Sequence, residues 1–195
     1  MVKFLRRSAP DNSELSEESL KEAEGIAVPL PKKADIQAVT NAVLRKIDII
    51  QTKGKKIRML KTLGRLPSAW VPSVFIELLS DESEEIRNLA VKELARREDC
   101  PIEKLYERLN RPPWYAKSAV LRLLSLKKPP EAAKHILCVL NDPNADVKCC
   151  AAAALGEIGG QEARKLLVRM HKDQNRYVRA AVEQALEKLC DFKFS

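Results

Sequence analysis

Hydrophobic and polar positions repeat along this chain with a period of about thirty residues. A small or branched apolar residue followed by a base occurs four times, at intervals of 30, 31 and 31 residues. We call the apolar residue of each pair the anchor. Self-similarity at such a period is typical of a solenoid, in which similar units stack in a row. The four pairs are Ile86-Arg87, Ala116-Lys117, Val147-Lys148 and Val178-Arg179.

Two apolar stripes accompany each anchor and predict a pair of helices per unit. Steps of four residues stay on one helix face, and the positions four and eight residues after the anchors are apolar. They are Ala90, Val120, Ala151 and Val182, then Leu94, Leu124, Leu155 and Leu186. The positions eleven and seven residues before the anchors form a second stripe. They are Phe75, Leu105, Ile136 and Leu167, then Leu79, Leu109, Leu140 and His171. Each unit is therefore expected to be a helical hairpin that buries its stripes against its neighbours.

The turn inside each hairpin carries a recurring aspartate. Asp81, Asp142 and Asp173 lie six residues before the recurring base, and Arg111 replaces the aspartate in one unit. Aspartate is a preferred N-cap, so we expect these residues to cap the second helices. Glu84 would complete a capping box with Asp81, and Pro143 would occupy the first helical position after Asp142.

These features resemble the HEAT repeats, and in particular the short HEAT-like repeats of phycobilin lyase subunits. The most similar stretch runs from Asp142-Pro143 through Val147-Lys148 to Leu155-Gly156-Glu157-Ile158. The resemblance covers about residues 65–190 and is weakest in the unit with Arg111. It implies an all-α, right-handed α-solenoid of about five stacked HEAT-like hairpins. It also implies that the second helices line the contact face, without indicating which partner binds there.

The period and the composition together predict how the chain is divided. Residues 1–33 contain an acidic, polar stretch with six acids and one base between Asp11 and Glu24, which predicts a disordered segment. Residues 34–195 are expected to form the solenoid. Residues 34–66 are interpreted as a degenerate first repeat whose second helix departs from the register of the others. The remaining repeats are predicted at about 67–98, 99–128, 129–159 and 160–190.

Charge distinguishes the solenoid from the segment that precedes it. The 195 residues carry a formal net charge of +8, and residues 1–33 carry none of it. No acid occurs from Ile49 to Ile76, where six bases form a candidate polyanion-binding patch. These bases are Lys53, Lys55, Lys56, Arg58, Lys61 and Arg65. A solvated helix face that aids solubility is the simpler alternative.

The recurring bases at 87, 117, 148 and 179 have a structural and a functional interpretation. By the resemblance, each would pair with the turn aspartate of its own or the neighbouring unit, which favours a structural role. Lys117 has no aspartate in its own unit, so it is expected to be free for a ligand. Exposed aromatics beside these bases are plausible contact anchors. The candidate partner-binding residues are Asn88, Lys92, Trp114, Tyr115, Lys117, Arg122, Lys148, Tyr177 and Arg179.

No catalytic, metal or phosphate-binding signature accompanies this architecture. The two histidines are not followed by Glu, no cluster has zinc spacing, and Gly54-Lys55-Lys56 lacks the full P-loop pattern. His171 is expected to be part-buried at a helix end, and the five cysteines are expected to be reduced, mostly buried thiols in a cytoplasmic protein. The sequence therefore favours a non-catalytic scaffold without cofactor or metal that binds another protein. Nucleic-acid binding and a phycobilin-lyase-like or chaperone subunit are the alternatives.

Overall fold

A computed structural model describes residues 36–191, and every regular element in this range is helical. The predicted segment 1–33 lies outside the described residues. Five hairpins follow one another, each made of a first and a second helix. The first helices are α2 (Ile36–Asp48), α4 (Val71–Leu78), α6 (Ile102–Leu109), α8 (Ala132–Ile136, continued by the 3-10 helix η1, Leu137–Val139) and α10 (Gly160–Met170). The second helices are α3 (Lys53–Leu63), α5 (Glu84–Arg96), α7 (Trp114–Lys127), α9 (Ala145–Ile158) and α11 (Arg176–Asp191).

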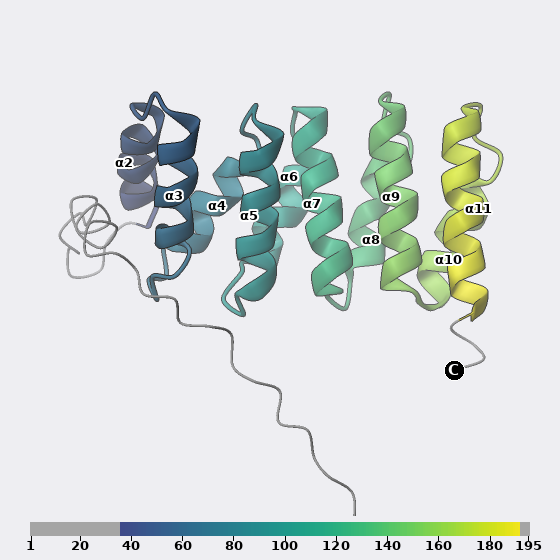
Figure 1. Cartoon of the computed structure of the whole chain (residues 1–195). Coiled ribbons are helices and arrows are strands. Elements are labelled where there is room, and N and C mark those ends of the chain that lie inside the picture. Colours follow the sequence, from purple (N-terminus) through teal and green to yellow (C-terminus); the bar gives the residue numbers. More distant parts are fainter. Residues whose placement is uncertain (1–35, 192–195) are drawn as a thin grey trace, which may run out of the picture.

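The hairpins stack side by side into an α-solenoid of two layers. The second helices stand roughly parallel in one layer, and the first helices form the other layer behind them (Figure 1). Each second helix from α5 onward contacts the second helix before it and the first helix of its own hairpin. The expected all-α solenoid of about five hairpins is confirmed.

The core lies between the two layers and follows the predicted stripes. The anchors Ile86, Ala116, Val147 and Val178 are at most 3% exposed. On the first helices, Phe75, Leu105, Ile136 and Leu167 are fully buried. His171 departs from the stripe: it follows α10 directly and is exposed. The stripe has ended there, since Met170 fills the buried position one residue earlier.

The first hairpin follows the same register as the others, so the prediction of a different register is wrong. In the other units, the stripe residues lie four and eight residues after the anchor. On α3, the buried residues Met59 and Leu63 lie four and eight residues after Lys55. Lys55 therefore occupies the anchor position. It lies in the exposed first turn of α3, and a charged residue at the anchor position conceals the register in the sequence.

The turn aspartates are not N-caps, because the second helices begin later than predicted. The Oδ1 atom of Asp142 accepts the Asn144 N–H at 2.9 Å, and Asn144 in turn caps α9 by accepting the N–H groups of Asp146 and Val147. Asp81 and Asp173 likewise accept N–H groups two residues onward, at 2.8 Å each. The predicted helical position of Pro143 and the capping box of Glu84 are wrong for the same reason. Each aspartate fixes the turn itself rather than the helix end.

Close helix packing at the C-terminal end depends on a glycine. A Cβ atom on Gly156 would lie 2.9 Å from the Cβ and 3.0 Å from the Cα of Ala185, so α9 and α11 approach to backbone contact there. Gly64 has the equivalent place on α3 and faces the carboxylate of the buried Glu93. Small residues at this position set the spacing between neighbouring second helices.

Replacing Gly156 by alanine is expected to destabilise the chain by about 1–3 kcal/mol, because α9 and α11 must separate to accept the methyl group. Gly54→Ala is the matched control. A Cβ on Gly54 meets nothing within 4 Å in the first turn of α3, so this change should leave stability unchanged or raise it by up to about 1 kcal/mol. Urea denaturation followed by circular dichroism measures both. Equal stability of the two variants would contradict the close packing.

Candidate interaction surface

The second helix of one repeat is tied to the turn of the next repeat by a lysine–aspartate pair. The Lys117 Nζ lies 2.7 Å from the Asp142 Oδ2, and the Lys148 Nζ lies 2.7 Å from the Asp173 Oδ2. A third pair joins Lys56 of the first hairpin to Asp81 in the turn of the second, at 2.9 Å. In all three the lysine precedes its partner by 25 residues, and the paired side chains are at most 19% exposed. We call these pairs the inter-repeat ladder.

The ladder corrects the expectation that Lys117 is free for a ligand. Its partner is the aspartate of the following repeat, so the missing aspartate of its own repeat is irrelevant to it. The residue that lacks an aspartate is Arg87, because the following repeat has Arg111 at that position. Lys148, another candidate contact residue, is likewise held within the ladder.

Arginine replaces lysine at the two ladder positions that no described aspartate follows. The Arg87 Nη1 donates to the carbonyls of Asp81 and Glu82, both at 2.8 Å, within its own turn. Arg179 does the same with the carbonyls of Asp173 and Gln174, at 2.7 and 3.0 Å. A guanidinium has several donors in a fixed fork and suits two carbonyls better than an ammonium does. Both arginines thus stabilise their own turns.

A second set of cations connects the opposite ends of the second helices. The Arg97 Nη1 donates to the carbonyls of Gly64 and Leu66, at 3.3 and 3.1 Å, at the end of α3. One repeat further on, the Lys127 Nζ donates at 2.6 Å to the Arg97 carbonyl of the repeat before it. Carbonyls at a helix C-terminus lack partners within the helix and attract positive charge. Five of the basic residues described so far therefore serve in contacts between repeats.

A groove of about 470 Å³ lies on the layer of second helices, across α5, α7 and α9. Four of the candidate contact residues line it: Asn88, Trp114, Tyr115 and Arg122. Sequence reasoning missed the small residues that line the groove beside them. These are Ala119, Cys150, Ala153 and Ala154. Only the repeat register in the sequence could have indicated that these residues lie on the contact surface. Ala153, for example, lies six residues after its anchor, as Lys92 and Arg122 do after theirs.

Polar and aromatic contacts hold the groove side chains in place. The Arg122 Nη1 donates to the Asn88 Oδ1 at 2.6 Å, across two repeats. The Arg87 guanidinium lies 4.6 Å from the centre of the Tyr115 ring, and this ring meets Trp114 edge-on at 5.8 Å. Trp114 remains 47% exposed, so the groove has an accessible aromatic wall. Tyr177 occupies on α11 the repeat position that Tyr115 has on α7. It contacts Arg176 and lies outside the groove.

The candidate polyanion patch is smaller than the sequence indicates. Lys56 belongs to the ladder, and the Lys53 Nζ pairs with the Glu85 Oε2 at 2.7 Å. The acids that neutralise these two lysines come from the next repeat, which a reading of the local sequence overlooks. The rest of the patch is exposed and has no acidic partner among residues 36–191. These residues are Lys55, Arg58, Lys61 and Arg65.

Exposed cations form a row across neighbouring second helices. Lys61, Lys92 and Arg122 occupy the same repeat position on α3, α5 and α7, and all three are exposed. The next two positions of the row hold Ala153 on α9 and Gln184 on α11. We call Lys61, Lys92 and Arg122 the basic row. The row of exposed cations at this repeat position therefore ends at the groove.

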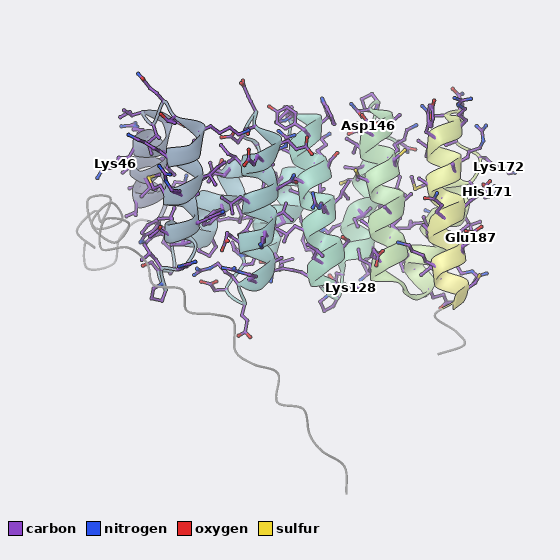
Figure 2. All side chains as sticks on the ribbon, viewed as in Figure 1. Lys46, Lys128, Asp146, His171, Lys172 and Glu187 are labelled. Atoms are coloured by element: carbon purple, nitrogen blue, oxygen red, sulfur yellow. The ribbon has the colours of Figure 1, made fainter. Side chains whose placement is uncertain are left out.

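Charges of both signs occupy the rest of this layer, where α11 carries bases such as Arg176 and Lys188 beside its acids. Asp146 lies at the start of α9, and Glu187 lies on α11 (Figure 2). Glu157 accepts a hydrogen bond from the Lys188 Nζ at 2.6 Å and lines the groove. His171 and Lys172 follow α10 at the end of the stack, away from the groove (Figure 2).

The described cysteines are all free thiols. The same part of the chain contains no candidate metal site and no candidate membrane span. Cys100 is buried, and burial raises its pKa to about 11. The expectation that most cysteines are buried is wrong, since Cys149 and Cys150 are only partly buried and Cys138 and Cys190 are exposed. Within residues 36–191 no three His, Cys, Asp or Glu side chains gather as a metal would require. No described helix is both long and apolar enough to cross a membrane.

Comparison with known proteins supports a HEAT-repeat family for this chain. The family model of HEAT repeats matches residues 102–187, which span the last three hairpins. The match names HEAT repeats and not the phycobilin lyase subfamily. No curated protein is similar in sequence.

Solved structures of two engineered proteins from a structural genomics consortium are similar to this chain. The first shares 20% identity over 90% of each chain, with a TM-score of 0.46. The second shares 20% identity over 80% of this chain and 50% of its own, with a TM-score of 0.43. Neither likeness carries an inference about function.

The ladder should make stability depend on pH through Asp173. Partial burial raises the pKa of Asp173, but the hydrogen bonds from Lys148 and the Asn175 N–H, with nearby positive charge, outweigh burial and lower it. The stabilisation is therefore complete above the unfolded pKa of about 3.9 and is lost as the pH falls through the lower folded value. Asp173→Asn should remove this part of the acid dependence. Denaturation midpoints of the wild type and the variant at pH 6 and pH 3 measure this dependence. The same loss of stability between the two pH values in both proteins would contradict the stabilising role of the Lys148–Asp173 pair.

Proposed function

We propose that this chain is a non-catalytic scaffold that binds another protein through the layer of second helices. HEAT repeats generally serve as protein-interaction scaffolds, and the family match supports such repeats here. The observation that carries the proposal is the groove across α5, α7 and α9, which is lined by a half-exposed tryptophan and by an arginine that a hydrogen bond orients. Aromatic and arginine side chains dominate binding energy at protein interfaces.

The groove and the basic row supply the contact residues in this proposal. Lys92, Trp114 and Arg122 are exposed, while Lys117 and Lys148 join neighbouring repeats and Arg179 holds its own turn. A charge reversal at Lys117 would therefore perturb the fold. Variants that test binding must avoid the ladder.

Binding of nucleic acid or another polyanion to the α3 patch is a second proposal. Its support is the set of four exposed cations without an acidic partner among the described residues. Such a set can neutralise a few phosphates and would give strongly salt-dependent binding. The pairing of Lys53 and Lys56 reduces its charge, and we therefore prefer the protein-binding proposal.

Reversing Lys92 and Arg122 together to glutamate is expected to weaken partner binding at least about tenfold, because two cations at the contact surface become repulsive. Arg164→Glu is the matched control, since Arg164 is exposed on α10 in the other layer. Co-purification with the tagged full chain, with a photoreactive residue at Ser118 in the groove, measures the effect.

The melting temperatures of both variants should stay close to that of the wild type, since neither touches the ladder. Loss of the cross-linked partner in the double variant and its retention in Arg164→Glu is the expected result. An unchanged set of cross-linked proteins in the double variant would contradict the proposed surface.

A further inference from the structure

Resting on the proposed function, we infer that the partner contributes an extended acidic segment, with carboxylates at about every third residue and an apolar side chain at one end. The segment runs across the second helices along the basic row. Its carboxylates meet Lys61, Lys92 and Arg122, and its apolar side chain enters the groove. The inference follows from the spacing of the row, the place where the row ends and the charge around it.

The spacing of the basic row fits an extended peptide. Lys61, Lys92 and Arg122 lie at one repeat position, so neighbouring cations are about one helix spacing apart. Packed helices lie about 8–10 Å apart. A peptide in the extended polyproline II conformation advances about 3.1 Å per residue with three residues per turn, so every third side chain lies on the same face. A peptide that crosses the layer therefore advances about three residues for each helix. Side chains three residues apart can meet successive cations.

The end of the row defines where the apolar side chain binds. The next position after Arg122 is Ala153, which is exposed and lines the groove together with Ala119, Ala154 and Trp114. A small residue leaves the space that a cation fills in the earlier repeats. Ala153 offers no cation to a carboxylate at this repeat position, unlike the residues of the basic row in the earlier repeats. An apolar side chain can instead pack against the exposed face of Trp114.

The cations of the row keep their charge available. Lys92 has no hydrogen-bond or ion-pair partner within residues 36–191, and the same holds for the ammonium of Lys61. Arg122 is held by a neutral amide, so its orientation is fixed without loss of its charge. An oriented guanidinium retains donors for a carboxylate and loses less side-chain entropy on binding.

Charge density favours an acidic peptide over a nucleic acid as the occupant. Double-stranded DNA has one charge per about 1.7 Å of its axis, and each of its strands one per about 3.4 Å. The row offers one cation per helix spacing, and the face beyond it carries Asp146 and Glu157. A peptide with an acid at every third residue matches the row one to one. A polyphosphate would leave most of its charges unpaired along this row.

The test selects peptides on the full chain. A displayed library of random twelve-residue peptides is selected for binding to the wild type and counter-selected on Lys92→Glu/Arg122→Glu. Expected peptides carry Asp or Glu at intervals of three with an apolar residue at one end. Synthetic copies should bind the double variant at least about tenfold more weakly, and Arg164→Glu equally well. A scrambled copy of the same composition should also bind more weakly, since the spacing is lost.

The other outcomes overturn the inference and bear differently on the proposed function. Selected peptides that need the basic row but lack the spacing would refute the acidic pattern and leave protein binding supported. If no peptide depends on the row, the inference fails, and the cross-linking at Ser118 then decides the proposed function separately. Tighter binding of a twenty-residue oligothymidine than of any selected peptide would assign the surface to nucleic acid.

Discussion

Each turn aspartate of the inter-repeat ladder joins two repeats, and the geometry of the stack depends on it. One carboxylate oxygen of Asp142 holds its own turn through the Asn144 N–H, and the other accepts the Lys117 ammonium of the preceding repeat. The internal shape of a turn and the position of a neighbour are thus fixed by one side chain. The pair is mostly shielded from water, so its hydrogen bond is stronger than that of an exposed ion pair. The apolar stripes supply most of the buried surface, but they do not by themselves fix the position of one repeat against the next.

Once the repeats are held in register, the same positions recur side by side on neighbouring helices. This repetition turns single residues into rows: ladder cations at one end of the second helices, carbonyl-binding cations at the other, and exposed cations between them. Only the middle row is available to a partner. On the second helices, the ladder cations and the carbonyl-binding cations therefore hold the stack, while the basic row faces solvent. The proposed recognition of an acidic protein segment uses the basic row.

The sequence predicts the solenoid because burial has a fixed period, and every anchor it indicates is buried. It predicts less of the surface, because contacts between repeats join residues 25 to 34 positions apart. Lys117 looks unpaired within its own repeat, and only the fold brings Asp142 to it. Lys56 escaped notice for the opposite reason: its neighbour Lys55 breaks the apolar pattern, although the spacing from Lys56 to Asp81 equals that of the other pairs. The groove is lined partly by alanines, which carry no chemical signature until the helices are packed.

A double-mutant cycle between Lys117→Met and Asp142→Asn tests the role of the ladder most directly, with the free energy of unfolding as the readout. The account predicts a coupling of about 1–2 kcal/mol in favour of the intact pair, since it is a charge-assisted hydrogen bond largely shielded from water. The exposed Lys134–Glu131 pair within α8 and its N-cap is the matched control and should show no resolvable coupling. Equal coupling in the two cycles, or none for Lys117 and Asp142, would contradict the claim that this pair holds neighbouring repeats together.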